Sequence, residues 1–142
     1  MPRALLIIDV QRTLCEGRHA CFEVERVIDR INQVSRAART AGVPVVLIQH
    51  ETTGGGSMDR GSPGWELAPD LETAPGDQRV GKRATDAFHQ TDLQALLQRL
   101  GVDELVICGL QSDFCVDTTT RRALALAYPV VLKWKDPNLI GP

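Results

Sequence analysis

Cys115 is the residue whose type and position could most readily do covalent chemistry. It follows an apolar segment that ends at Gly109 and a tight turn, and a helix-like stretch begins near Asp113. Backbone N–H groups point outward at the start of a helix, and the helix dipole there favours the thiolate, the nucleophilic form of cysteine. The sequence therefore predicts that Cys115 is a nucleophile.

The other three cysteines are interpreted as chemically quiet. Cys108 lies inside the apolar segment and is expected to be a small buried side chain. Cys15 and Cys21 are interpreted as incidental loop and helix-start residues. None of these spacings is typical of a zinc site, and disulfides are not expected in a reducing compartment.

Strand-like and helix-like segments alternate along the chain. Five segments are predicted to be strands: residues 4–8, 45–48, 78–80, 105–109 and 129–132. Three are predicted to be helices: residues 23–41, 91–100 and about 113–127, of which the second opens on a possible capping box at 91–94. Continuous apolar runs indicate parallel strands that are buried on both faces. The order predicts a single domain over residues 1–142, a three-layer α/β/α sandwich with a central, mainly parallel sheet.

Residues 51–77 are predicted to form one long irregular loop, because glycine and proline are frequent there. Loops of this length in a compact domain are usually functional lids or disordered insertions. Trp65 and Leu67 suggest that this loop packs down onto the domain.

Polar residues follow the predicted strands at the points where those strands end. Asp9, Gln49-His50 and Lys82 follow the first three strands, and the turn at 111–115 follows the fourth. Ligands bind at the carboxyl ends of the strands in open parallel sheets. A carboxylate there could take the thiol proton, an ammonium could hold the thiolate, and helix-start N–H groups could stabilise an oxyanion.

Each of these residues also has an ordinary structural interpretation. Asp9 could be only a turn or helix cap, and Lys82 could be a solvated surface residue. His50 is ranked first as a satisfied polar group at a strand end. Phe88 and Trp65 are more often core residues than walls of a substrate pocket.

Composition excludes several classes of function. The 142 residues carry a net charge of −2 with scattered basic residues, which argues against nucleic-acid and polybasic membrane surfaces. No stretch reaches the apolar length of a membrane span. The chain runs from Met-Pro-Arg directly into a strand without a signal-peptide pattern, so a cytoplasmic protein is expected. The first strand ends in Asp9-Val-Gln11 rather than a GxGxxG turn, which argues against a dinucleotide-binding domain.

The chain resembles the isochorismatase-like cysteine hydrolases. The matching segments are Ala4-Leu-Leu-Ile-Ile-Asp-Val-Gln11, Gly64-Trp-Glu-Leu67, Gly81-Lys-Arg-Ala-Thr-Asp-Ala-Phe88 and Val106-Ile-Cys-Gly-Leu-Gln-Ser-Asp-Phe-Cys-Val116. They occur in the family's order and span nearly the whole chain. The resemblance implies a Rossmann-like fold.

The resemblance also implies a catalytic triad of Asp9, Lys82 and Cys115. It implies a cis peptide bond between Leu110 and Gln111, and an oxyanion hole made by the N–H groups of Gln111 and Cys115. In the implied reaction Asp9 deprotonates Cys115, the thiolate attacks a carbonyl, an amine or ammonia leaves, and water resolves the thioester. The residues expected to contact the substrate are Gln11, His50, Trp65, Phe88 and Phe114.

Two departures from the family refine this expectation. Nicotinamidases bind a metal through an Asp-x-His pair and a further His after the second strand, whereas Ile48-Gln-His-Glu-Thr-Thr53 is followed by no second His in the loop. We therefore expect no metal and no cofactor. Isochorismatases that cleave a vinyl ether lack the nucleophilic cysteine, so Cys115 favours the amidase-like branch.

The second departure, after the missing metal-binding histidines, is at the C-terminus. Family members continue past the fifth strand through another helix and a sixth strand, and this sequence stops at Pro142. Strand 129–134 is then expected to be an apolar sheet edge that a partner subunit or the tail covers, so a homo-oligomer is predicted.

The leading hypothesis is a metal-independent cysteine hydrolase that cleaves a C–N bond in a small amide, ureide or N-carbamoyl compound. The alternative is a catalytically silent relative that binds small molecules or protein partners. The residues alone do not identify the substrate.

Overall fold

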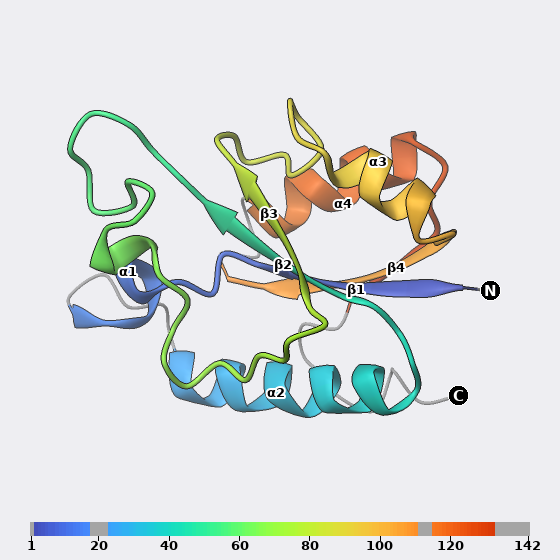
Figure 1. The fold of residues 1–142 in the computed structure, drawn as a ribbon, viewed down its shortest axis with the longest axis horizontal. Coiled ribbons are helices and arrows are strands. Elements are labelled where there is room, and N and C mark those ends of the chain that lie inside the picture. The colour runs from blue at the N-terminus through green and yellow to red at the C-terminus, as the bar shows by residue number, and fades with distance from the viewer. Residues whose placement is uncertain (1, 18–22, 111–114, 133–142) are drawn as a thin grey trace.

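The computed structural model of this chain describes residues 2–17, 23–110 and 115–132. Within these ranges five parallel strands form one sheet in the order β3-β2-β1-β4-β5 (Figure 1). The strands are β1 (Arg3–Ile8), β2 (Val45–His50), β3 (Gln78–Lys82), β4 (Glu104–Gly109) and β5 (Val130–Leu132). The helices are α1 (Arg12–Cys15), α2 (Val24–Thr40), the 3-10 turn η2 (Pro63–Trp65), α3 (Leu93–Arg99) and α4 (Asp117–Ala125). This arrangement confirms the predicted α/β sandwich with a parallel sheet.

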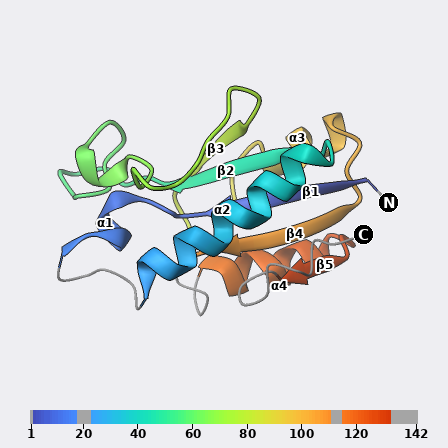
Figure 2. The ribbon, with the colours of Figure 1, turned by 90° about the horizontal axis from the view of Figure 1, so that it is seen from below.

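The central strands are buried on both faces because helices cover both sides of the sheet. Figures 1 and 2 show α2 on one face and α3 with α4 on the other. Leu5 and Ile7 of β1 enter the core under α2. The alternate residues Leu6 and Ile8 enter the core under α3 and α4. This double burial explains why β1 is a continuous apolar run and not an alternating pattern.

Helix α2 presents one apolar stripe to the sheet, as its spacing predicts. The buried residues Ile28, Ile31, Val34 and Ala38 recur every three or four positions. The helix ends just before Gly42, whose φ of 74° is the left-handed conformation expected of a glycine that closes a helix.

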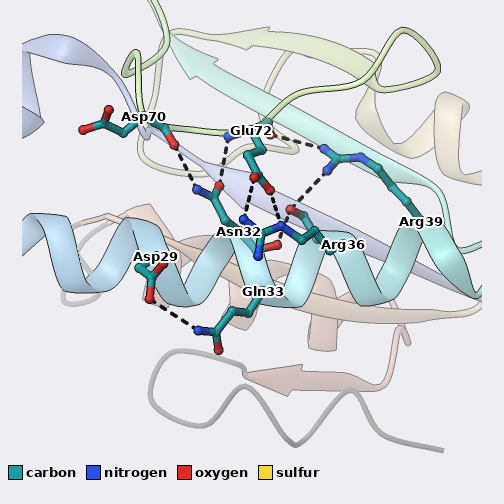
Figure 3. A network of polar contacts seen from close by, with 8 residues as sticks. Asp29, Asn32, Gln33, Arg36, Arg39, Asp70 and Glu72 are labelled. Carbon is teal, nitrogen blue, oxygen red and sulfur yellow. Dashed lines mark hydrogen bonds and ion pairs between the residues drawn. The ribbon is translucent and has the colours of Figure 1, made fainter.

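The loop between β2 and β3 is tied to α2 by polar contacts (Figure 3). The buried Asn32 side chain donates to the Asp70 carbonyl and accepts from the Glu72 N–H, both at 2.9 Å. Arg36 pairs with the Glu72 carboxylate at 2.5 Å, and Arg39 donates to the Glu72 carbonyl at 3.3 Å. The loop therefore packs down onto the domain, as predicted, and it lies against the helix at its carboxyl half.

The predicted capping box at 91–94 does not form. Helix α3 has Asp92 at its N-cap position, and no side chain caps it. Thr91 instead donates from Oγ1 to the Ala87 carbonyl at 2.6 Å and accepts from the Leu93 N–H at 3.3 Å. The hydroxyl therefore connects the preceding turn to the helix, which a local sequence pattern does not encode.

Several boundaries differ from the sequence prediction, and two of them bear on the site. Strand β3 continues two residues beyond the predicted 78–80, so Lys82 is its last residue. Helix α4 spans Asp117–Ala125, inside the predicted 113–127. The first part of that prediction, at 111–114, lies outside the described residues.

The chain reverses its direction of winding between β1 and β4. From β1 it proceeds outward to β2 and β3, and then returns to place β4 and β5 on the other side of β1. Ile8 and Gly109 are register partners at this switch point. Gly109 has a φ of 147°, and a Cβ there would overlap the Ile8 carbonyl oxygen, so only glycine fits. Ligand sites of open α/β sheets lie beside such a switch point.

Candidate active site

Four elements bring polar side chains to the carboxyl edge of the sheet. Asp9 directly follows β1, His50 ends β2, Lys82 ends β3, and Cys115 lies just before α4. His50 and Lys82 are register partners, so His50 lies on the strand between those of Lys82 and Asp9. Side chains from distant parts of the sequence therefore converge at the switch point.

The Lys82 ammonium group is the centre of this cluster. Its Nζ lies 3.1 Å from Asp9 Oδ2 and 3.3 Å from Cys115 Sγ. It also lies 3.2 Å from His50 Nδ1 and 2.9 Å from the Ala84 carbonyl oxygen. The structure thus brings together all three residues of the implied triad.

Burial sets the electrostatics of the cluster. Lys82 is 1% exposed and Asp9 is 2% exposed, so neither charge is stabilised by bulk water. The alternative interpretation of Lys82 as a solvated surface residue is therefore wrong. A buried charge is stable only when it is paired and hydrogen-bonded, and here each of the two charges compensates the other.

Asp9 is held in an uncommon backbone conformation. Its φ is 60°, in the left-handed region that aspartate tolerates better than most residues. Its N–H donates to the Ile48 carbonyl at 2.9 Å and its carbonyl accepts from the Gln11 N–H at 2.9 Å. Oδ2 faces Lys82, whereas Oδ1 is buried and has no hydrogen-bond partner among the described residues. One carboxylate oxygen is therefore open to a proton.

The surroundings of Cys115 favour the neutral thiol over the thiolate, so the implied deprotonation by Asp9 is required before Cys115 can act as a nucleophile. Its pKa is raised to about 11, first by burial and then by the charge and hydrogen bonding of Asp9, whose effect exceeds the lowering by Lys82. A position near the start of α4 does not overcome these effects. The proton that must leave Sγ therefore lies beside the Asp9 carboxylate.

Cys108 shows what burial alone does to a thiol in this chain. It is fully buried in β4, and burial raises its pKa to about 12. Its Sγ donates to the Leu6 carbonyl oxygen at 3.7 Å. No charged group is among the causes of its shift, in keeping with the predicted role as a small core residue.

Gln11, which is predicted to contact the substrate, has a structural role inside the protein. Its side chain is 0% exposed, and its amide is fully engaged inside the protein. Nε2 donates to the carbonyls of His50 and Trp65 at 2.9 and 2.8 Å, and Oε1 accepts from the His50 N–H at 2.8 Å. Gln11 therefore holds the end of β2 and the following loop in place.

Phe88 and Trp65, both expected to contact the substrate, lie in different surroundings. Phe88 is buried in the core and stacks on Tyr128 with 6.2 Å between ring centroids. Trp65 is half-buried and lines a cavity of about 370 Å³ together with Gln49 and Arg79. Asp9, Lys82 and Cys115 do not line that cavity. The core interpretation of Phe88 is therefore the correct one.

The remaining predicted site features lie outside the described residues. They are the Gln111 N–H of the oxyanion hole, the cis peptide bond between Leu110 and Gln111, and the Phe114 side chain.

The Ala84 carbonyl is a site group that the sequence did not reveal. It accepts the shortest of the Lys82 contacts, at 2.9 Å. Thr119 holds the segment after it, because its Oγ1 accepts from the Ala87 N–H at 3.0 Å and donates to the Thr85 carbonyl at 3.3 Å. A backbone acceptor leaves no mark in residue type, so no pattern could have found it.

The part of the chain that the structure describes contains neither a cluster of metal-ligating side chains nor a helix that could span a membrane. Within residues 2–17, 23–110 and 115–132, no three His, Cys, Asp or Glu side chains are grouped to hold a metal ion. In those same ranges no helix is long and apolar enough to cross a bilayer.

Comparison with known proteins identifies the class to which this fold and site belong. Residues 3–133 match the family model of the isochorismatase domain, so the chain belongs to the isochorismatase family. A streptothricin hydrolase of Streptomyces noursei is 42% identical over 130 residues, which cover 92% of this chain and 47% of that protein. The chain spans about half the length of the curated streptothricin hydrolases that it matches.

Solved structures show the same fold. A crystal structure of an isochorismatase family protein has a TM-score of 0.87 and 37% identity, covering 92% of this chain and 77% of that one. The N-carbamoylsarcosine amidase of Thermoplasma acidophilum has a TM-score of 0.85 and 26% identity, covering 97% of this chain and 88% of that one.

Proposed function

We propose that this protein is a metal-independent cysteine hydrolase that cleaves a C–N bond in a small amide, ureide or N-carbamoyl compound. One observation carries the proposal: a single buried ammonium, Lys82 Nζ, lies 3.1 Å from the Asp9 carboxylate and 3.3 Å from Cys115 Sγ. This is the arrangement of a nucleophile, a base and a charge-compensating cation.

The reaction begins with a proton transfer from Cys115 to Asp9. The Sγ electron pair then forms a bond to the substrate carbonyl carbon, and the C=O electrons move onto oxygen. The N–H groups predicted to form the oxyanion hole, those of Gln111 and Cys115, stabilise that oxygen. Lys82 offsets the negative charge on sulfur while the thiolate exists.

The second half of the reaction returns the proton and releases the acid. The proton held by Asp9 passes to the leaving nitrogen, the C–N bond breaks, and ammonia or an amine departs. Water then attacks the thioester carbonyl with Asp9 as base, and the C–S bond breaks to restore the thiol. Asp9 thus serves both steps without a net change in its protonation.

The neutral thiol of the resting site supports this sequence. A pKa of about 11 means that the proton stays on sulfur until Asp9 accepts it. The nucleophile is then formed only in the bound complex, where water is excluded. The names of two relatives, a streptothricin hydrolase and an N-carbamoylsarcosine amidase, agree with hydrolysis of a non-peptide C–N bond.

The test is a screen for ammonia or amine release over small amides, ureides and N-carbamoyl amino acids. We expect wild-type protein and the matched control Cys108→Ala to hydrolyse the same compound, and Cys115→Ala to be inactive. Mass spectrometry after acid quench should show the acyl group on Cys115. Activity in Cys115→Ala, or loss of activity with a chelator, would contradict the proposal, and an inactive wild-type protein would favour the silent alternative.

A further inference from the structure

The His50 ring is held in a fixed position beside Lys82. Gln11 binds both the N–H and the carbonyl of His50, at 2.8 and 2.9 Å, so the end of β2 cannot shift freely. The ring Nδ1 lies 3.2 Å from Lys82 Nζ. His50 itself is half-buried, in contrast to the almost completely buried Asp9 and Lys82.

Lys82 has more acceptors around it than it has protons. An ammonium group carries three N–H donors. Four atoms that can accept a hydrogen bond lie within 2.9–3.3 Å of Nζ: Ala84 O, Asp9 Oδ2, Cys115 Sγ and, when its ring hydrogen is on Nε2, His50 Nδ1. The four acceptors fall into two kinds, because Ala84 O and His50 Nδ1 belong to neutral groups, whereas Asp9 and Cys115 exchange a proton in the proposed reaction.

We propose that His50 is a positioning residue for Lys82: as a neutral imidazole with its hydrogen on Nε2, it accepts one Lys82 N–H at Nδ1. This inference rests on the proposed function. His50 and Ala84 O then hold two of the three N–H groups in fixed directions. The third Lys82 N–H is left to Asp9 and Cys115. It donates to Asp9 in the resting site and to sulfur once the proton has moved from Cys115 to Asp9.

Protonation of His50 would disable this arrangement. A ring that carries hydrogen on Nδ1 can no longer accept from Lys82, and two cations would lie side by side. Lys82, Asp9 and Glu51 are the charged groups that act on the ring. Burial and then Lys82 lower the His50 pKa from its ordinary 6.5 by more than Asp9 and Glu51 raise it, so the ring stays neutral at pH 7.

The first test compares pH profiles of kcat/KM for three variants. In His50→Asn the side-chain oxygen takes the place of Nδ1 but does not titrate. In His50→Leu the acceptor is lost, and the exposed His89→Asn is the matched control. We expect His50→Leu to lose about 10²-fold in kcat, the scale of a misplaced catalytic group.

The expected profiles differ in shape as well as height. Wild-type protein and His89→Asn should lose activity below pH 6.5 together. His50→Asn should keep most of the kcat at pH 8, and its acid limb should move to lower pH, because the asparagine side chain does not titrate. An acid limb that stays in place in His50→Asn, or equal kcat values in His50→Asn and His50→Leu, would overturn the proposal.

A second measurement does not depend on any substrate. The chain has three histidines, so their ring nitrogens can be resolved and assigned by NMR with His50→Asn and His89→Asn. We expect the Nε2–H form of His50 at pH 7, and a rise in its pKa when Lys82 is replaced by Met. An Nδ1–H form would overturn the role of His50 even if the enzyme is active. The Nε2–H form in a protein that hydrolyses nothing in the screen would refute the proposed function instead.

Discussion

Lys82 Nζ and Asp9 Oδ2 form an ion pair at 3.1 Å in which the side chains are 0% and 3% exposed. Lys82 ends β3 and Asp9 directly follows β1, and these strands are not neighbours because β2 lies between them. An ion pair with so little water around it costs desolvation energy, and removal of one partner leaves the other charge uncompensated. Stability and the proposed chemistry therefore depend on the same contact.

Lys82→Met should lower the free energy of unfolding by about 3–5 kcal/mol, because the Asp9 carboxylate would be buried alone. Urea denaturation followed by circular dichroism gives the value. The double variant Asp9→Asn/Lys82→Met should lose less than the sum of the single losses. The exposed pair Arg36–Glu72 is the control, and Arg36→Met should cost much less than Lys82→Met because water and salt screen an exposed ion pair. Equal costs for Lys82→Met and Arg36→Met would mean that the buried pair has no special weight.

Asp9→Asn should affect hydrolysis and alkylation in opposite directions. Hydrolysis should fall by about 10²-fold or more, because the general base is lost. Asp9 raises the pKa of Cys115, so its removal lowers that pKa and increases the thiolate fraction at a given pH. Iodoacetamide at pH 8 should therefore label Cys115 faster in the variant, as measured by peptide mass spectrometry. Slower labelling in Asp9→Asn would show that the carboxylate does not hold the proton on sulfur.

In the wild-type protein the labelling rate of Cys115 should rise steadily as the pH approaches about 11. The reason is that, at pH values below the pKa, each increase of one pH unit raises the thiolate fraction about tenfold. Cys108, with a pKa of about 12 and complete burial, should label more slowly throughout. A plateau below pH 8 for Cys115 would indicate a preformed thiolate and would contradict the resting state described above.

Gln11→Leu should destabilise the protein by about 2–4 kcal/mol, because the buried N–H and carbonyl of His50 lose their partners. Activity should fall as well, since the end of β2 is no longer held beside Lys82. The matched control Gln33→Leu replaces an exposed glutamine and should change stability by less than about 0.5 kcal/mol. Chemical denaturation and kcat measurements on both variants check these expectations. A destabilised Gln11→Leu with full activity would refute the expected loss of activity.

Gly109→Ala should cost at least about 3 kcal/mol, since the new Cβ would overlap the Ile8 carbonyl at the switch point. Gly101→Ala is the control, because Gly101 also has a positive φ, 69°, but no atom lies within 4 Å of its added Cβ. Its cost should stay at about 1–2 kcal/mol, the penalty of the left-handed conformation alone. Thermal unfolding of the two variants should rank them in that order.

The fold could be predicted from the sequence because its determinants are local. The continuous apolar run of β1 and the stripe of Ile28, Ile31 and Val34 on α2 each specify an element and its buried face. Gly42 marks the end of α2 through its own backbone preference. The capping box at 91–94 was wrong for the opposite reason, because the contacts of Thr91 are decided by the preceding turn and not by the four residues of the pattern.

The site could be predicted only in part. Positions at strand ends and the family resemblance pointed to Asp9, Lys82 and Cys115, which lie close together in the structure, but residue type does not determine which side chains are satisfied internally. The amide of Gln11 and the ring of Phe88 could contact a substrate or the protein, and only their long-range neighbours, Trp65 and Tyr128, show that both make internal contacts. The protonation of Cys115 likewise follows from burial and Asp9, neither of which is visible in the residues around the thiol.

The contact of Lys82 across β2 has a consequence for how the molecule opens. Edge strands are ordinarily the first part of a sheet to exchange their amide hydrogens, since little holds them. Strand β3 ends in Lys82. Local opening of that end would expose the ammonium to water and leave the Asp9 carboxylate buried without its partner. We therefore expect fraying of this outer strand and disassembly of the site to be one cooperative event, so that β3, the edge strand on the β2 side, exchanges its amide hydrogens about as slowly as the central strands.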